Sequence, residues 1–496
     1  MNNLQSLSYY WPELLLVTTI LAAVVYDLLT KPSESQRVGL LVFAGLVLTL
    51  FANWFTSAER NITLFLDSLA LDPFAQFFKT IIIFSTLFVI LISRKSNELR
   101  IYRTGEYYTL IAIMVFGMFL MVSAIDLIMV YLSIEVVSIS SFILAGYLKQ
   151  DQRSNESSLK YVIYGAFSSG LMLFGLSILF GLTGTTKFFE IQNVISGLDT
   201  SSHFALIIAS VFILAGFGYK ISAVPFHFWT PDVYEGAPTP VTAYLSVAPK
   251  AAGFALLIRF FHVLFTDAGL FLESENGIPT IPWPQVLAGI SVATMTLGNL
   301  VAIQQSSVKR MLAYSSIAHA GYMLMAMPIL SGNGVFAIMI YLVMYLFMNL
   351  GAFFVVIIVK NKTGGETFED FRGLGWEMPL VGIVMALFMF SLTGIPPTAG
   401  FIGKFYIFAA VIKAGPSFYW LVFAGAVNSV ISLYYYMRVV KVMFLEGESK
   451  EEHIFPSILE SALIIILAAP TLFLGVYWAP IAEWITNSLR FFHQGI

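Results

Sequence analysis

The sequence predicts an all-α polytopic membrane protein with about fourteen transmembrane helices, and three observations lead to that fold class. Hydrophobic residues fill 58% of the 496 positions and charged residues only 11%, whereas soluble domains carry about 25% charged residues. Apolar runs of about 20 residues, long enough to cross a bilayer, recur along the chain. Lysine and arginine gather in alternate connections between these runs, which is typical of multi-pass proteins.

The predicted spans are joined by short connections. The first apolar run, residues 11–30, has no basic leader before it and is long enough to span, so we interpret it as a retained helix rather than a cleaved signal. The spans that follow are expected at residues 37–56, 72–93, 107–123, 126–148, 158–183, 203–230, 240–266, 283–304, 309–330, 334–360, 378–412, 416–445 and 456–488.

The basic residues predict the orientation of the chain. The connections between spans form two sets, one on each side of the membrane, and one set is richer in lysine and arginine. Cytoplasmic loops carry an excess of these residues, so the richer set should lie on the cytoplasmic side of the cell (inner) membrane. Both termini should lie on the other side. The poorer set is Arg60, Lys187, Lys413 and Arg490. The richer set is Lys31, Arg37, Arg94, Lys95, Arg100, Arg103, Lys149, Arg153, Lys160, Lys309, Arg310, Lys360, Lys362, Arg372, Arg438, Lys441 and Lys450.

Two of the spans contain helix-breaking residues. In the seventh, Pro225 follows shortly after Lys220, and in the twelfth the run Gly394–Gly400 divides a segment that is too long for one straight helix. The twelfth span comes five spans after the seventh. Because five is an odd number, the two spans cross the bilayer in opposite directions. Paired interrupted spans indicate inverted repeats with a site near the membrane midplane.

We therefore predict four segments, each without a long linker to the next. They are three N-terminal transmembrane helices (1–106), a first five-helix repeat (107–266), a second, inverted five-helix repeat (283–445) and a C-terminal transmembrane helix (446–496). Each repeat is expected to contain one broken helix.

Three lysines, Lys220, Lys250 and Lys404, lie inside predicted spans. A charge at membrane depth costs several kcal/mol unless it meets a partner or water, so it indicates function by default. Pro249 should break the helix that carries Lys250. The alternative is that the lysines are permanently paired structural charges. Lys79 and Arg259 also lie within spans, but near helix ends, where a long side chain can extend to the interface.

Glu135, in the middle of the fifth span, is the candidate counter-ion of Lys220. A nearby carboxylate stabilises the ammonium form of a buried lysine, whereas burial favours the neutral form. Moving the carboxylate from about 10 Å to about 4 Å at an effective dielectric of about 20 changes the interaction by about 2.5 kcal/mol. That range suits a group that gains and loses a proton. The alternative is a packing carboxylate satisfied by a neighbouring serine.

Two histidines extend this candidate chain. His227 follows Pro225, and His319 is central in the tenth span; imidazole can relay protons at physiological pH. A lone histidine in a helix bundle equally fits a hydrogen-bonded core residue. Asp232 and Glu235 follow the break in the seventh span, where they either gate proton entry or cap helix ends.

Several function classes are disfavoured. The chain has no cysteine, which excludes thiolate-bound iron–sulfur clusters and zinc, disulfides and cysteine nucleophiles. A net charge of −3 argues against a nucleic-acid partner. The six histidines show no metal-ligand spacing, and no phosphate loop or dinucleotide fingerprint is present. We expect no cofactor and no metal in this chain.

Four stretches resemble the proton-translocating antiporter-like subunits of respiratory complex I, an NADH:quinone oxidoreductase. They are Lys220 with Pro225–Pro240, Ala248–Gly253, Lys309–His319 and Gly394–Lys404, and the resemblance extends over nearly the whole chain. It implies that Glu135 and Lys220 form the pair on the fifth and seventh helices, that Lys250 is the connecting lysine on the eighth, and that Lys404 is the exit-side lysine on the twelfth.

The resemblance also implies a place in a larger assembly. The partners would be the lipid bilayer and other membrane-arm subunits of complex I, and NADH, FMN, iron–sulfur clusters and quinone would belong to partner subunits. A photosynthetic relative fed by ferredoxin has a similar subunit, so the electron donor stays open. The alternatives are a subunit of a cation/proton antiporter without redox partners and a purely structural membrane scaffold.

Overall fold

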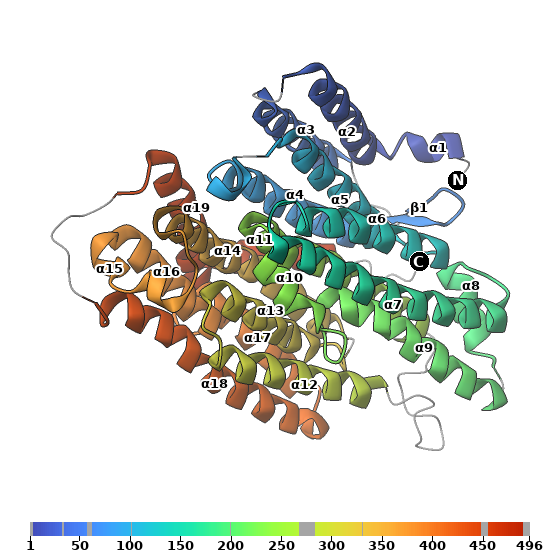
Figure 1. Cartoon of the computed structure of the whole chain (residues 1–496). Helices are drawn as coiled ribbons and strands as arrows, with labels where there is room; N and C mark the ends of the chain where they lie inside the picture. The colour runs from blue at the N-terminus through green and yellow to red at the C-terminus, as the bar shows by residue number, and fades with distance from the viewer. Residues whose placement is uncertain are drawn as a thin grey trace.

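The computed structural model describes residues 3–31, 34–56, 62–100, 102–198, 200–266, 283–329, 331–447 and 455–489. Within these ranges the chain is a bundle of long helices that run roughly side by side (Figure 1). One short antiparallel hairpin pairs Ile62 with Leu71. The first segment contains α1 (Asn3–Leu7), α2 (Trp11–Leu29), α3 (Gln36–Phe55), β1 (Ile62–Leu64), β2 (Leu69–Leu71), α4 (Pro73–Ser93) and the 3-10 turn η2 (Asn97–Leu99).

The middle of the chain forms two runs of helices. The first run contains α5 (Gly105–Ser123), α6 (Leu127–Ala145), α7 (Gln152–Thr183), α8 (Phe188–Ile195), α9 (Thr200–Ile221), α10 (Trp229–Gly236), α11 (Thr239–Phe261) and η3 (His262–Thr266). The second contains α12 (Trp283–Ile303), α13 (Val308–Leu324), α14 (Gly332–Thr363), η4 (Phe368–Phe371), α15 (Leu374–Glu377), α16 (Pro379–Thr393), α17 (Ala399–Lys413), η5 (Pro416–Phe418) and α18 (Tyr419–Phe444). Helices α19 (Ile458–Val476) and α20 (Ala479–Ser488) follow.

The predicted fold class, a polytopic all-α membrane protein, is confirmed. Twelve helices in the described ranges are long and apolar enough to cross a membrane, or thirteen if a bent pair around Met378 is counted as one span. The two predicted spans outside those twelve also correspond to helices. The 309–330 span is the 17-residue α13, and the 378–412 span is divided between α16 and α17, of 15 residues each.

Two of the three predicted helix breaks are confirmed, those after Lys220 and at Gly394. Helix α9 ends at Ile221, and seven residues separate it from α10; within them Ser222 has a φ of 64° and the Val224–Pro225 bond is cis. Helix α16 ends at Gly394, whose φ is 91°, a conformation that favours glycine.

The prediction that Pro249 breaks its helix is wrong. Helix α11 continues through Pro249 from Thr239 to Phe261. Proline removes one backbone N–H and leaves one carbonyl without its helical partner. Every residue of α11 is buried, and a helix surrounded by other helices tolerates such a defect better than one exposed to lipid.

The two runs of helices share local features. Helices α7 and α14 each have 32 residues and each ends at a glycine in the left-handed conformation, Gly184 or Gly364. The segment after each glycine then pairs with the start of an earlier helix, through Asp126 with Lys187 and Ser307 with Thr367. These parallels support the repeat hypothesis. The division at 107–266 and 283–445, and the inverted relation of the two halves, stay predictions.

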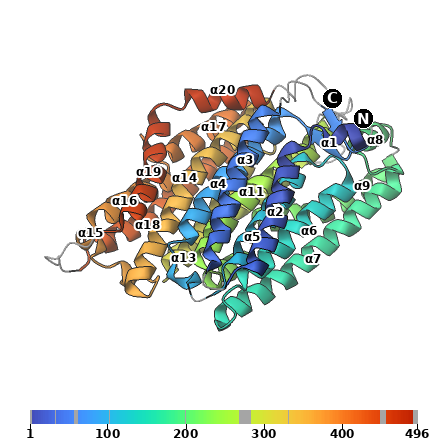
Figure 2. The ribbon, with the colours of Figure 1, turned by 90° about the horizontal axis from the view of Figure 1, so that it is seen from above.

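The predicted basic side corresponds to one end of the bundle, here called the basic end. Residues from distant parts of the sequence contact one another there. Lys360 pairs with Glu98, and the side chain of Asn361 accepts from the N–H of Asn97 and donates to the carbonyl of Lys95. Helices α1, α8 and α20 lie at the opposite edge (Figure 2), where Trp484 of α20 packs on Phe77 near the start of α4. Which end faces the cytoplasm stays a prediction.

Two buried ion pairs involve the first segment: Arg259 with Asp72 ties it to α11, and Lys79 with Glu13 joins α4 to α2 within it. The guanidinium of Arg259 donates to both carboxylate oxygens of Asp72 at 2.7 and 3.0 Å and to the carbonyl of Val122 at 3.1 Å. Lys79 lies 2.6 Å from Glu13. All four charged side chains are buried, so the expectation that Lys79 and Arg259 extend to the interface is wrong. Each cation meets a carboxylate from a distant segment, which makes burial less costly than it would be on an isolated helix.

We expect Asp72→Asn to destabilise the protein by about 3–5 kcal/mol, because it leaves the Arg259 charge buried without a counter-charge. Asparagine can still cap α4 as Asp72 does through the N–H of Ala75, so the variant isolates the charge. Thermal melting of the purified protein measures the effect. Asp67→Asn, at an exposed residue 3.6 Å from Lys187, is the control and should change little.

Glu98 at the basic end should make stability depend on pH. Burial would raise its pKa, but the charges of Lys309 and Lys360 and the N–H of Thr239 lower the pKa from 4.5 to about 2. A lowered folded-state pKa contributes stability above the unfolded value, and this contribution is lost as the pH falls through the folded value. The stability difference between wild type and Glu98→Gln should be up to about 3 kcal/mol at neutral pH. It should shrink between about pH 4.5 and 2; a difference that does not change with pH would contradict this assignment.

Candidate functional site

Lys220 is held where α9 ends at the first helix break. Its side chain is 3% exposed, and its Nζ donates to the hydroxyl of Ser138 on α6 at 3.1 Å. Because the helix stops one residue later, the backbone beyond Lys220 is free to turn away. The ammonium group therefore sits inside the bundle next to a section of irregular backbone, as predicted from the sequence.

Glu135 lies one turn before Ser138 on the same helix. Its Oε1 is buried and has no hydrogen-bond partner, and the interactions of the described residues include no ion pair within 4.0 Å between Glu135 and Lys220. Instead, Lys220 contacts the neutral hydroxyl one turn away. In this arrangement the carboxylate and the ammonium are near neighbours on facing helices but are not in contact.

Lys250 lies at the centre of α11, the most enclosed helix of the bundle. It is 1% exposed and donates to both the carbonyl and the hydroxyl of Ser316 on α13, at 2.8 and 2.6 Å. The ring of Tyr234 lies 5.9 Å from its Nζ. These partners are all neutral.

His319 lies one turn after Ser316 on α13 and is buried. Its Nδ1 is 2.6 Å from the hydroxyl of Tyr341, and its Nε2 is 3.0 Å from the hydroxyl of Tyr436. Tyr436 in turn lies 2.5 Å from the hydroxyl of Ser315. Both ring nitrogens are therefore engaged by groups that can donate or accept, so a proton can enter the ring on one side and leave on the other.

Lys404 lies in α17 just after the second break and is 5% exposed. Its Nζ donates to the carbonyl of Thr393, the residue before that break, at 2.8 Å and to the hydroxyl of Ser429 at 3.2 Å. The face of Tyr322, on the same helix as His319, lies 4.3 Å away. Lys404 is thus the counterpart of Lys220, a buried ammonium beside interrupted backbone.

His227 stands apart from this group. It lies in the first break, is 4% exposed, and packs beside Phe228 at 4.5 Å between ring centroids. In the described part of the chain its ring makes no hydrogen bond to the lysines, Glu135 or His319. The relay role predicted for it has no geometric support here.

Several polar partners of these residues were not predicted from the sequence. They are Ser138, which accepts from Lys220, and Tyr341 and Tyr436, which flank His319. A further buried cluster lies behind Lys404: Asn299 donates to Tyr322 and to Asn428. Amide side chains inside apolar spans are the sequence signal that could have located this cluster.

Asp232 and Glu235 form ion pairs rather than capping a helix. Asp232 lies 2.6 Å from Lys160 of α7 and 2.9 Å from Arg310 of α13, and Glu235 also pairs with Arg310. These side chains line a cavity of about 210 Å³ at the basic end. The electrostatic pull of Lys160 and Arg310 outweighs partial burial and lowers the pKa of Asp232.

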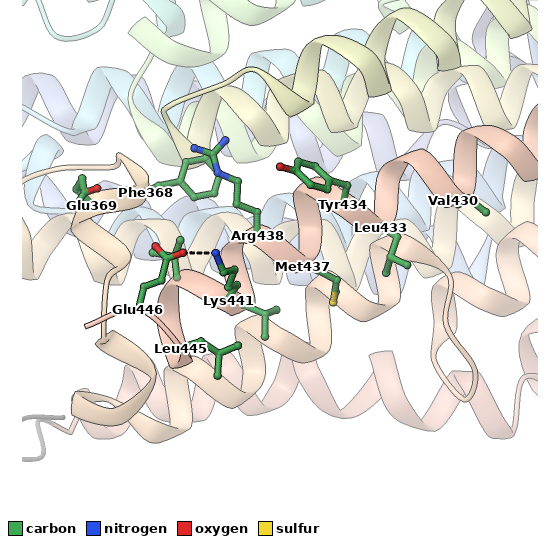
Figure 3. A pocket seen from close by; sticks show the side chains of 12 residues that line it. Phe368, Glu369, Val430, Leu433, Tyr434, Met437, Arg438, Lys441, Leu445 and Glu446 are labelled. Atoms are coloured by element: carbon green, nitrogen blue, oxygen red, sulfur yellow. Dashed lines mark ion pairs between the residues drawn. The ribbon is translucent and has the colours of Figure 1, made fainter. Parts of the chain in front are cut away.

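A groove of about 900 Å³ lies on the outer face of α18, away from the buried lysines. Figure 3 shows Arg438 beside the ring of Phe368 and an ion pair between Lys441 and Glu446. The groove is lined by Phe368, Glu369, Val430, Leu433, Tyr434, Met437, Arg438, Val440, Lys441, Val442, Leu445 and Glu446. None of the six predicted site residues is among them, so the candidate site is the buried polar chain and not this groove.

Comparison with known proteins shows the family to which this chain belongs. Residues 124–432 match the family described as NADH:quinone oxidoreductase/Mrp antiporter, TM. The chain is 46% identical to NADH-quinone oxidoreductase subunit N 2 of Sorangium cellulosum, over 99% of this chain and 98% of that protein. It is 44% identical to NADH-quinone oxidoreductase subunit N of an Anaeromyxobacter species, over 99% and 98%.

This chain belongs to the subunit N family of NADH-quinone oxidoreductase. It is therefore related to a membrane subunit of an oxidoreductase complex. The resemblance to the antiporter-like subunits of complex I, predicted from its motifs, is confirmed.

Solved structures of membrane complexes share the fold. A chain of respiratory complex I from Thermus thermophilus is 27% identical, with a TM-score of 0.76 over 95% of this chain and 98% of that chain. A chain of the Mrp complex from Dietzia has a TM-score of 0.83 over 98% and 97%; at 20% identity it shows likeness of fold alone.

Proposed function

We propose that this chain moves protons across the membrane through Glu135, Lys220, Lys250, His319 and Lys404, driven by electron transfer in partner subunits of an NADH:quinone oxidoreductase. The identity with subunit N over nearly the full chain supports this redox-coupled function over an antiporter without redox partners.

One contrast among buried cations carries the proposal. Lys79 and Arg259 each contact a carboxylate at 2.6–2.7 Å, which fixes their charge. Lys220, Lys250 and Lys404 are equally buried, yet their hydrogen-bond partners are serine hydroxyls and backbone carbonyls. A buried ammonium without a contacting anion can release its proton, because burial then favours the neutral amine.

The steps follow from these contacts. When Glu135 approaches Lys220, its charge stabilises the ammonium and the lysine binds a proton; when it withdraws, the proton becomes available to the next group. Lys250 contacts Ser316, which lies one turn before His319 on α13. His319 contacts Tyr436 of α18, and Ser429 of the same helix contacts Lys404. In each transfer the amine or imidazole that accepts the proton becomes a cation, and the cation that donates it becomes a neutral base.

The remaining chemistry would then belong to other chains. NADH, FMN, iron–sulfur clusters and quinone would be held by partner subunits, and the cytoplasmic side would be the basic end described above. The absence of cysteine in this sequence fits that division.

We expect Lys220→Ala and Glu135→Ala each to lower proton translocation by the assembled complex by about tenfold or more, because each removes a group that binds or attracts the proton. Proton uptake and release by reconstituted complex, measured against electron transfer, gives the result. Lys413→Ala, at the exposed end of α17, is the matched control and should behave like wild type. Translocation that stays intact in both variants would refute the pathway.

Lys250 allows a second test, which separates proton transfer from structural charge. Lys250→Ala should interrupt transfer while the complex still assembles. Lys250→Arg keeps the positive charge, but guanidinium does not release its proton in proteins, so we expect it also to block translocation. Restoration of pumping by Lys250→Arg, or loss of the whole complex from the membrane with Lys250→Ala, would instead indicate a structural role.

A further inference from the structure

An aromatic layer, formed by Tyr161, Tyr219 and Trp229, joins α7, α9 and α10 beside Lys220 in the chain. Tyr161 of α7 stacks on Trp229, the first residue of α10, with ring centroids 4.4 Å apart and planes at 15°. Trp229 Nε1 donates to the carbonyl of Tyr219 at 3.0 Å, and Tyr219 donates its hydroxyl to the carbonyl of Tyr161 at 3.0 Å. The three side chains are almost fully buried.

The layer adjoins both a charged cavity and the buried lysine along the chain. Lys160 and Asp232 line the 210 Å³ cavity; Tyr161 follows the first, Trp229 lies three residues before the second, and Tyr219 precedes Lys220. The cavity has room for several water molecules and is lined by charged groups that can bind them. Aromatic rings offer water few partners, so a stack placed between the cavity and Lys220 would interrupt a continuous water chain.

We propose that the Tyr161–Trp229 stack is a closed gate between the cavity at the basic end and Lys220, and that the ion pairs of α10 are its latch. This inference rests on the proposed function of Lys220 as a proton station. Tyr161 and Trp229 are positioning residues here, since they control access and do not themselves carry the proton.

The latch joins α10 to both halves of the bundle. Asp232 and Glu235, which follow Trp229 on α10, pair with Lys160 of α7 and Arg310 of α13. Lys309, next to Arg310, donates to the backbone carbonyls of Glu235 and Ala237 at 3.0 and 2.7 Å. Helix α13 also carries Ser316, the acceptor of Lys250. A shift of α13 when Lys250 gains or loses its proton would therefore pull directly on α10.

The exposure of the latch suits a movable contact. The side chains of Arg310, Asp232 and Lys160 are 27%, 32% and 37% exposed, so their charges stay hydrated when the pairs separate. The Arg259–Asp72 pair, in contrast, is wholly buried and serves as a permanent link. The break at Ser222–Phe228 leaves α10 connected to α9 by non-helical backbone that can take up a tilt.

The absence of native cysteine makes a direct test possible. Ser222 lies in the break next to Lys220 and is fully buried. In the assembled complex, Ser222→Cys is treated with a small water-soluble methanethiosulfonate reagent, and labelling of this chain is followed by mass spectrometry. The comparison is between wild-type Arg310, Arg310→Gln, which weakens the latch, and Arg310→Lys, which keeps its charge.

Labelling at position 222 should be slow with the native latch and about tenfold faster with Arg310→Gln, within the usual range of coupling between sites. Arg310→Lys should stay slow. Trp229→Ala should also give fast labelling, because it removes the stack while the ion pairs remain. Glu156→Cys, exposed at the cavity rim, is the control that should label equally fast in every background.

An unchanged rate with Arg310→Gln would overturn the latch, and an unchanged rate with Trp229→Ala would overturn the gate. Ser85→Cys, buried in α4, should stay unlabelled; if it reacts together with position 222, the bundle loosens as a whole and a local gate is refuted. Because labelling measures access and not pumping, this result is independent of the translocation assays on Lys220. Failure of the gate and failure of the pathway can therefore be told apart.

Discussion

The structure depends on the groups that contact positively charged side chains inside the membrane-spanning bundle. Where the charge is permanent, the chain supplies a carboxylate in direct contact, as for Arg259 with Asp72 and Lys79 with Glu13. Where the proposed role requires a lysine to bind and release a proton, the chain supplies hydroxyls and carbonyls. These groups can accept hydrogen bonds from an ammonium or from a neutral amine. The same residue type is thus given two environments, and the partner rather than the lysine determines which role it can have.

The helix breaks follow from the same requirement. A regular helix in a membrane satisfies its backbone groups internally, although a carbonyl oxygen has a second lone pair, as when Ser316 of α13 accepts from Lys250. A helix end adds carbonyls that have no helical partner at all. At the second break, Lys404 binds the carbonyl of Thr393, which is free because α16 stops there. At the first break, the end of α9 lets the chain turn and start α10 beneath the cavity. The interruptions therefore provide both ligands for charge and points of movement.

Much of this arrangement could be predicted from the sequence, since apolar length and breaker residues act locally. The long spans and the breaks after Lys220 and at Gly394 followed from such signals. The error at Pro249 arose because surrounding helices protect α11, and the error at Lys79 and Arg259 because their carboxylates come from distant segments. Ser138, Tyr341 and Tyr436 were missed for a similar reason: common side chains become significant only when packing places them beside a lysine or His319.

Helices α6 and α13 carry different residues at one matching position. Glu135 and Ser316 stand at the same distance along the chain from the capping residues Asp126 and Ser307, so the second half has a neutral group where the first has an anion. Among the residues of the proposed path, Glu135 is then the one acid beside three lysines and His319. Two ammonium groups about 10 Å apart repel by about 1.7 kcal/mol at an effective dielectric of about 20. Simultaneous occupancy is thereby disfavoured, and protons should advance singly, each vacated station making room for the one behind it.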